Sequence, residues 1–146
     1  MTFTRTQRYL LSVLAGILMV ISFPFTGSVT LLAFLAWIPL LLVEDEISTK
    51  KIRSSNVFIQ AFIVFTIYNL GTTWWVSYAS LQGALLAYVL NTLFMTILFY
   101  LFHISKKYLG KTLGYSSLLF YWVSFEFLHY HWELSWPWLH LGNYFS

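Results

Sequence analysis

The chain contains no cysteine among its 146 residues, and it has few charged side chains. The absence of cysteine excludes disulfides, thiolate zinc sites and thiol nucleophiles within these residues. Asp, Glu, Lys and Arg together make up 9% of the chain, whereas soluble domains typically carry about 25%. Because 59% of the residues are hydrophobic, a soluble helix bundle is the disfavoured alternative. The composition predicts that lipid surrounds most of this chain.

Long uncharged stretches divide the chain into predicted membrane helices. Residues 9–43 and 54–105 contain no Asp, Glu, Lys or Arg, and each is too long for one span of roughly 20 residues. Pro24 and Gly27 predict a turn within the first stretch, and the more polar residues 76–83 predict one within the second. We therefore expect an all-α integral membrane fold. Its five transmembrane helices are predicted over residues 6–23, 28–43, 57–77, 83–104 and 112–132.

The distribution of basic residues predicts the orientation of these helices. Every Lys and Arg falls in residues 1–8, 44–56 or 105–111, and cytoplasmic loops are the ones enriched in Lys and Arg. The N-terminus is therefore expected in the cytoplasm and the C-terminal segment in the periplasm, in a multi-pass protein of the cell inner membrane. We interpret the first helix as a retained signal anchor, with a cleaved signal peptide as the alternative. Nothing in the pattern indicates nucleic-acid binding.

Glu126 is the most informative single residue because it lies within an apolar predicted helix. An ionisable group there is costly in lipid and should face the bundle or water. At helical spacing it shares a face with His129, Tyr130 and Glu133, which suggests a polar track towards the outer surface. The alternatives are a structural carboxyl that accepts hydrogen bonds between helices, and a metal site formed with His129 and Glu133.

The other polar residues of the predicted helices suggest structural roles. Asn69 and Asn91 are expected to join helices by hydrogen bonding. His103 is expected to hydrogen-bond carbonyl groups at the end of its helix. No motif for an activated nucleophile and no glycine-rich phosphate loop is present. We therefore predict no catalytic residue, no metal and no cofactor site within this chain.

Three stretches together resemble one family of bacterial enzymes. They are "LAGILMVISFPFTGSVTLLAFLAWIPLLL", "YNLGTTWWVSYA" and "YWVSFEFLHYHWELSWPWLHLGN". Their order and spacing resemble the membrane portion of the apolipoprotein N-acyltransferases, and the "SWPWLHLGN" form is similar to the Bacteroidetes branch. The similarity extends over nearly the whole chain.

The resemblance implies a reaction and its partners. The family transfers an acyl chain from a phospholipid donor to the α-amino group of the diacylglyceryl-cysteine of an apolipoprotein. The transfer proceeds through a thioester on an enzyme cysteine, within a Glu–Lys–Cys triad of a nitrilase-like domain. Because this chain has no cysteine, that domain is expected beyond residue 146. The chain is therefore expected to be the N-terminal membrane portion, a fragment that is inactive alone.

The resemblance also implies where the substrate approaches. Trp136, Pro137 and Trp138 match the outer segment near the entrance of the family's active site, and Trp138 is the first candidate to face substrate. Glu126 completes the predicted substrate-binding set. A plain interfacial anchor is the alternative for the tryptophans. Two alternative functions are a small membrane transport or binding protein that uses Glu126, and a structural membrane subunit with no site.

Overall fold

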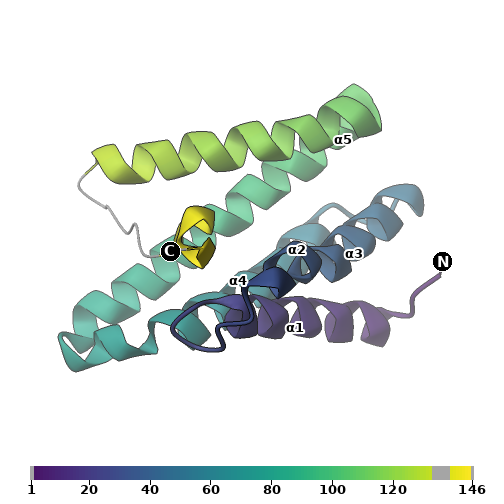
Figure 1. Ribbon diagram of the computed structural model, residues 1–146. Helices are drawn as coiled ribbons and strands as arrows, with labels where there is room; N and C mark the ends of the chain where they lie inside the picture. The colour runs from purple at the N-terminus through teal and green to yellow at the C-terminus, as the bar shows by residue number, and fades with distance from the viewer. Residues whose placement is uncertain (1, 133–138, 146) are drawn as a thin grey trace.

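The computed structural model describes residues 2–132 and 139–145, and all regular structure within these ranges is helical. The helices form a bundle in which segments distant in sequence lie side by side (Figure 1). The predicted all-α fold is confirmed for these residues. Among them, two helices are long and apolar enough to cross a membrane, Ser55–Tyr78 and Leu81–His131.

The outside of the bundle carries large apolar side chains. Leu31, Phe34, Phe120 and Phe127 are 75%, 68%, 72% and 63% exposed, respectively. Leu31 and Phe34 come from two short helices over residues 30–36, and Phe120 and Phe127 come from the long helix Leu81–His131, so several elements expose apolar surface. Monomeric soluble proteins seldom present this much exposed apolar surface. The surface therefore fits a lipid environment.

Helix α1 (Arg5–Ser22) begins and ends where local sequence signals place its boundaries. Thr4 and Gln7 form a capping box, in which each side chain accepts a hydrogen bond from the other residue's backbone N–H. The helix ends just before Pro24, and three backbone N–H groups of the following turn donate to the Phe23 carbonyl. The turn predicted from Pro24 therefore forms.

The second predicted helix is broken into η1 (Thr30–Leu32), α2 (Ala33–Ala36) and α3 (Ile38–Thr49). Pro39 lies in the first turn of α3, where a missing N–H leaves no helical hydrogen bond unmade. The predicted end at residue 43 is wrong, because α3 continues through the acidic residues that follow. Those acidic side chains therefore stand on a helix and reach the bundle interior.

The next segment is α4 (Ser55–Thr73), extended by the 3-10 helix η2 (Trp74–Tyr78), and it is followed by α5 (Leu81–His131). Helix α5 contains one non-helical residue, Gly110, with φ of 84° and ψ of 176°. This left-handed conformation suits glycine, which has no Cβ to clash. The predicted loop over residues 105–111 is thus mostly helical and reverses direction at Gly110.

The two halves of α5 form an antiparallel helical hairpin around that kink (Figure 1). Near the kink, the hydroxyls of Ser105 and Tyr121 lie 2.8 Å apart. Farther from it, the rings of Phe94 and Phe125 are 5.9 Å apart between centroids. The hairpin places the last turns of α5 beside its own first half.

Helices α1 and α4 run parallel and pack closely. The Ser12 hydroxyl donates to Gln60 Oε1 over 2.7 Å. Farther along, a Cβ added to Gly71 would lie 2.4 Å from a Val20 methyl, and one added to Gly16 would lie 3.0 Å from a backbone carbonyl of α4. Small residues therefore permit the close approach of these helices, as they commonly do in membranes.

Hydrogen bonds join α4 to the first half of α5. The amide of Asn91 donates to Asn69 Oδ1 over 2.7 Å, and both side chains are buried. The Tyr88 hydroxyl donates to the Thr73 carbonyl over 2.8 Å. The predicted structural role of the two asparagines is confirmed.

After α5, the chain returns to the bundle as the 3-10 helix η4 (Leu141–Phe145). Tyr144 is 2% exposed. Its ring stacks on Tyr68 at an interplanar angle of 15° and meets Phe23 edge to face. The described part of the C-terminal segment packs into the aromatic core, because these rings gain burial there. The expected periplasmic location of the segment stays a prediction.

Charged residues gather at one end of the bundle. The N-terminus, the end of α3 and the kink of α5 lie together there (Figure 1). The Asp45 carboxylate is 3.2 Å from the Lys111 ammonium, and the Glu46 carboxylate is 3.7 Å from the Arg8 guanidinium. This grouping agrees with the division of basic residues seen in the sequence.

Candidate functional site

Glu126 lies in the second half of α5 and holds the returning segment. Its Oε1 accepts a hydrogen bond from the Leu141 backbone N–H over 2.7 Å. The same atom accepts one from the Trp122 indole N–H over 3.0 Å. Without this carboxyl, two donors near the core would lose their partner. The contacts favour the structural alternative, in which Glu126 positions residues 139–145.

The polar face predicted around Glu126 is divided by the fold. His129 is 1% exposed and faces the bundle, whereas Tyr130 is 59% exposed. Glu133 lies outside the described residues. Among the residues that the structure describes, no group of three His, Asp or Glu side chains is placed to hold a metal ion. The structure therefore brings Glu126 and His129 together in the interior, while Tyr130 faces outwards.

His140 is a buried residue of this region that sequence reasoning missed. It is 5% exposed, and its ring centroid lies 6.0 Å from that of His129. Neither ring has a hydrogen-bond partner within the described ranges. The two rings, Glu126 and Asn91 line one small interior space. No sequence signal pointed to His140, because its burial depends on the return of the chain after α5.

An apolar groove of about 380 Å³ lies beside this region. It runs between the α2–α3 segment and the second half of α5, and η4 closes part of it. Six of its lining residues are Phe34, Trp37, Leu41, Leu118, Trp122 and Phe145. Such a surface suits a hydrocarbon chain and offers little to a polar solute.

The predicted substrate-facing residues Trp136, Pro137 and Trp138 lie outside the described residues. Their role stays a prediction. The residue that follows them, Leu139, is 2% exposed and belongs to the core cluster. Leu141, two positions later, lines the groove. The described end of the Pro-Trp stretch is therefore in contact with the groove.

A second polar constellation is buried at the opposite end of the bundle. Glu44 is fully buried. Its Oε1 lies 2.7 Å from His103 Nδ1, and its Oε2 accepts from Lys106 Nζ over 2.6 Å. Lys106 also donates to Asp45 over 2.9 Å. The group connects α3 to α5 across 62 positions of sequence.

His103 differs from its predicted role at a helix end. Its Nδ1 faces Glu44, and its Nε2 lies 3.1 Å from the Ser54 hydroxyl. The ring therefore bonds side chains of α3 and of the residue before α4, and not the carbonyls of its own helix. Sequence reasoning placed the acidic run in a loop and so missed this partner.

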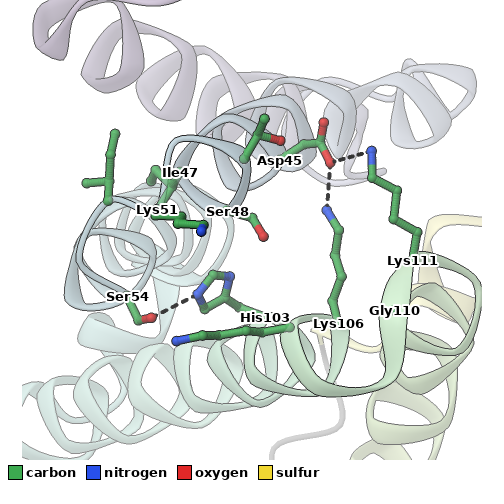
Figure 2. Close-up of a pocket in the computed structure, with 12 residues that line it drawn as sticks. Asp45, Ile47, Ser48, Lys51, Ser54, His103, Lys106, Gly110 and Lys111 are labelled. Carbon is green, nitrogen blue, oxygen red and sulfur yellow. Dashed lines mark hydrogen bonds and ion pairs between the residues drawn. The ribbon is translucent and has the colours of Figure 1, made fainter.

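A pocket of about 400 Å³ opens beside this ion network (Figure 2). Asp45, Ser54, His103, Lys106 and Lys111 are among its lining residues. The hydrogen bond from Lys106 is the main cause that lowers the pKa of Asp45 below its ordinary value, against a partial desolvation that raises it. Asp45 is therefore ionised at neutral pH, and its pairs with both lysines are between full charges.

Comparison with known proteins identifies the relatives of this chain. Residues 15–146 match the model of the apolipoprotein N-acyltransferase N-terminal domain. The chain is 30% identical over 140 residues to an apolipoprotein N-acyltransferase of Chlorobaculum tepidum. The aligned region covers 94% of this chain and 26% of that enzyme, so the chain spans about a quarter of the relative's length. No solved structure matches.

Proposed function

Because this chain belongs to the apolipoprotein N-acyltransferase N-terminal domain family, we propose that it is the membrane portion of such an acyltransferase. The enzyme would transfer an acyl chain from a phospholipid to the N-terminal diacylglyceryl-cysteine of a lipoprotein. The family match over residues 15–146 carries the proposal. The apolar outer surface and the apolar groove support it, because both suit a protein whose substrates are lipids.

The proposed chemistry requires residues beyond this chain. A thioester intermediate needs a thiolate nucleophile, and these 146 residues contain no cysteine. We propose that the nucleophile lies in a nitrilase-like domain beyond residue 146 and that the chain is inactive alone. Its own contribution is to bind and orient the acyl chains in the bilayer.

The proposed arrangement has five membrane segments in the cell inner membrane. They are α1, the α2–α3 segment, α4 with η2, and the two halves of α5. The position of the N-terminus, the end of α3 and the α5 kink at one end supports an arrangement with these parts in the cytoplasm. The opposite end, with Trp74 and Glu126, would then face the periplasm and the catalytic domain.

The apolar groove is the proposed site of the phospholipid acyl chain. Its walls belong to α3 and to the second half of α5, and its end is formed by η4. Phe34 and Phe145, which line it, are 68% and 62% exposed, so the groove is open to lipid from the side. The predicted substrate-facing role of Trp136, Pro137 and Trp138 is part of this proposal.

A hybrid enzyme tests the proposed reaction. Here this chain replaces the matching segment of the Chlorobaculum tepidum enzyme, and acyl transfer to a diacylglyceryl-lipopeptide is measured in phosphatidylethanolamine vesicles. The hybrid is expected to acylate the peptide, whereas the chain alone is expected to give no product. A hybrid that folds, as judged by size exclusion and thermal unfolding, but forms no product would contradict the proposal.

A photoreactive lipid tests the groove in the chain as it exists. Phosphatidylethanolamine with a diazirine on its acyl chain is expected to label peptides that contain Leu118 and Trp37. Ala33→Trp should fill the groove and reduce this labelling about tenfold, since Ala33 lines it. Leu10→Trp, on the exposed outer face of α1, is the matched control and should leave labelling unchanged. Equal labelling of all three proteins would refute the assignment.

A further inference from the structure

The pocket at the kink of α5 has an excess of positive charge. Asp45 is the acidic residue among its described lining, and Glu44 lies behind its wall. Four lysines line the pocket: Lys51, Lys106, Lys107 and Lys111. Their four ammonium groups exceed the two carboxylates of Asp45 and Glu44 by two, before any contribution from His103. Such an excess favours an anionic ligand.

The lysines of this pocket fall into two classes. Lys106 and Lys111 both pair with Asp45, at 2.9 Å and 3.2 Å. Lys51 and Lys107 have no carboxylate partner in the part of the chain that the structure describes. Figure 2 shows Lys51 on one wall and the paired lysines on the other. The two unpaired ammonium groups are thus available to a ligand.

Hydroxyl donors complete the lining. Ser48, Thr49 and Ser54 line the same pocket, and the Ser54 hydroxyl lies 3.1 Å from His103 Nε2 (Figure 2). Ammonium and hydroxyl groups around one concave surface are the groups that bind phosphoryl oxygens. We propose that this pocket binds a phosphoryl anion, a site distinct from the groove proposed for the acyl chain.

The surroundings of the pocket favour a phospholipid headgroup as the source of the phosphoryl group. Tyr108 and Leu109, which precede the kink, are 77% and 55% exposed. A headgroup in the pocket would therefore have apolar protein surface beside its acyl chains. Basic pockets between membrane helices on the cytoplasmic side bind such headgroups in other proteins.

Native mass spectrometry of the detergent-solubilised chain with phosphatidylglycerol tests this site. The pocket variant Lys51→Gln/Lys107→Gln removes the unpaired charges. The control variant Lys50→Gln/Arg53→Gln makes the same charge change outside the pocket lining. Because each lysine near an anionic surface contributes roughly fivefold to binding, the pocket variant should bind the lipid at least tenfold more weakly. The control variant should bind within about threefold of the wild type.

Inorganic phosphate distinguishes the two sources of the anion. If free phosphate is also a ligand, millimolar phosphate should raise the unfolding temperature of the wild type and of the control variant, but not of the pocket variant. If only phosphatidylglycerol discriminates between the variants, the site recognises a headgroup. Either result supports a phosphoryl site. Equal loss of lipid from both variants, or no response to either compound, overturns the proposal.

Discussion

Removal of the Glu126 carboxyl should release the segment that returns to the bundle. Glu126→Ala leaves the Leu141 N–H and the Trp122 indole N–H without their acceptor. An unsatisfied donor near the core costs about 1–3 kcal/mol, and only the Leu141 N–H belongs to the returning segment, since Trp122 and Glu126 are both on α5. At roughly 1.4 kcal/mol for each tenfold change in an equilibrium constant, the open population of residues 139–145 should rise at least about fivefold.

The cysteine-free chain offers a direct assay for this opening. Leu139→Cys introduces a single thiol at a position that is 2% exposed, and its reaction with a water-soluble maleimide follows the open population. In this background, Glu126→Ala should accelerate labelling at least about fivefold. Glu126→Gln, whose amide oxygen still accepts both hydrogen bonds, should stay within about threefold. Unchanged labelling in Glu126→Ala would refute the idea that this carboxyl holds the segment.

Three further predictions concern stability, measured by thermal unfolding in detergent. Glu44→Ala should destabilise the chain by about 3–5 kcal/mol because it leaves the Lys106 ammonium buried without its main partner; a variant as stable as wild type would contradict the network. Gly16→Leu should destabilise by at least about 1–3 kcal/mol through overpacking against α4, whereas Gly142→Leu, with open space around it, should have little effect. Asp45→Asn should lower the unfolding temperature at pH 7, because the pKa of Asp45 is lowered from 3.8 in the fold. The contribution of this carboxylate is present above pH 3.8 and is lost as the pH falls through the folded-state pKa, so the two proteins should converge in that acid range.

The helical segments and the division of charge were predictable because each depends on local sequence. The turn at Pro24 and the polar break near Ser80 are local signals, and α1 ends and α5 begins close to the positions they indicate. The hydrogen bond between Asn69 and Asn91 was also predictable, since a buried amide between apolar helices needs a partner.

The contacts between distant segments were not predictable from local patterns. Nothing in the acidic run indicates that Glu44 will pair with Lys106 on another helix. The reversal within residues 105–111 was predicted, but its position at Gly110 was not, because the residues before it are good helix formers and continue the helix to the kink. The burial of His140 and Tyr144 depends on both the hairpin and the returning segment, so it follows only from the complete packing.

The two polar constellations are coupled through the apolar groove between them. Near one end of the groove, Asp45 on α3 pairs with Lys111 at the start of the second half of α5. At the other end, η4 closes the groove and Glu126 holds its first residue, Leu141. Polar contacts on either side of the apolar surface therefore constrain the separation of the two groove walls, together with the rings of Trp37 and Trp122, whose centroids are 4.7 Å apart across the groove. Since hydrocarbon contacts are non-directional, the polar contacts help to fix the width available to an acyl chain. Both Asp45→Asn and Glu126→Ala should therefore alter lipid labelling in the groove, although neither residue lines it.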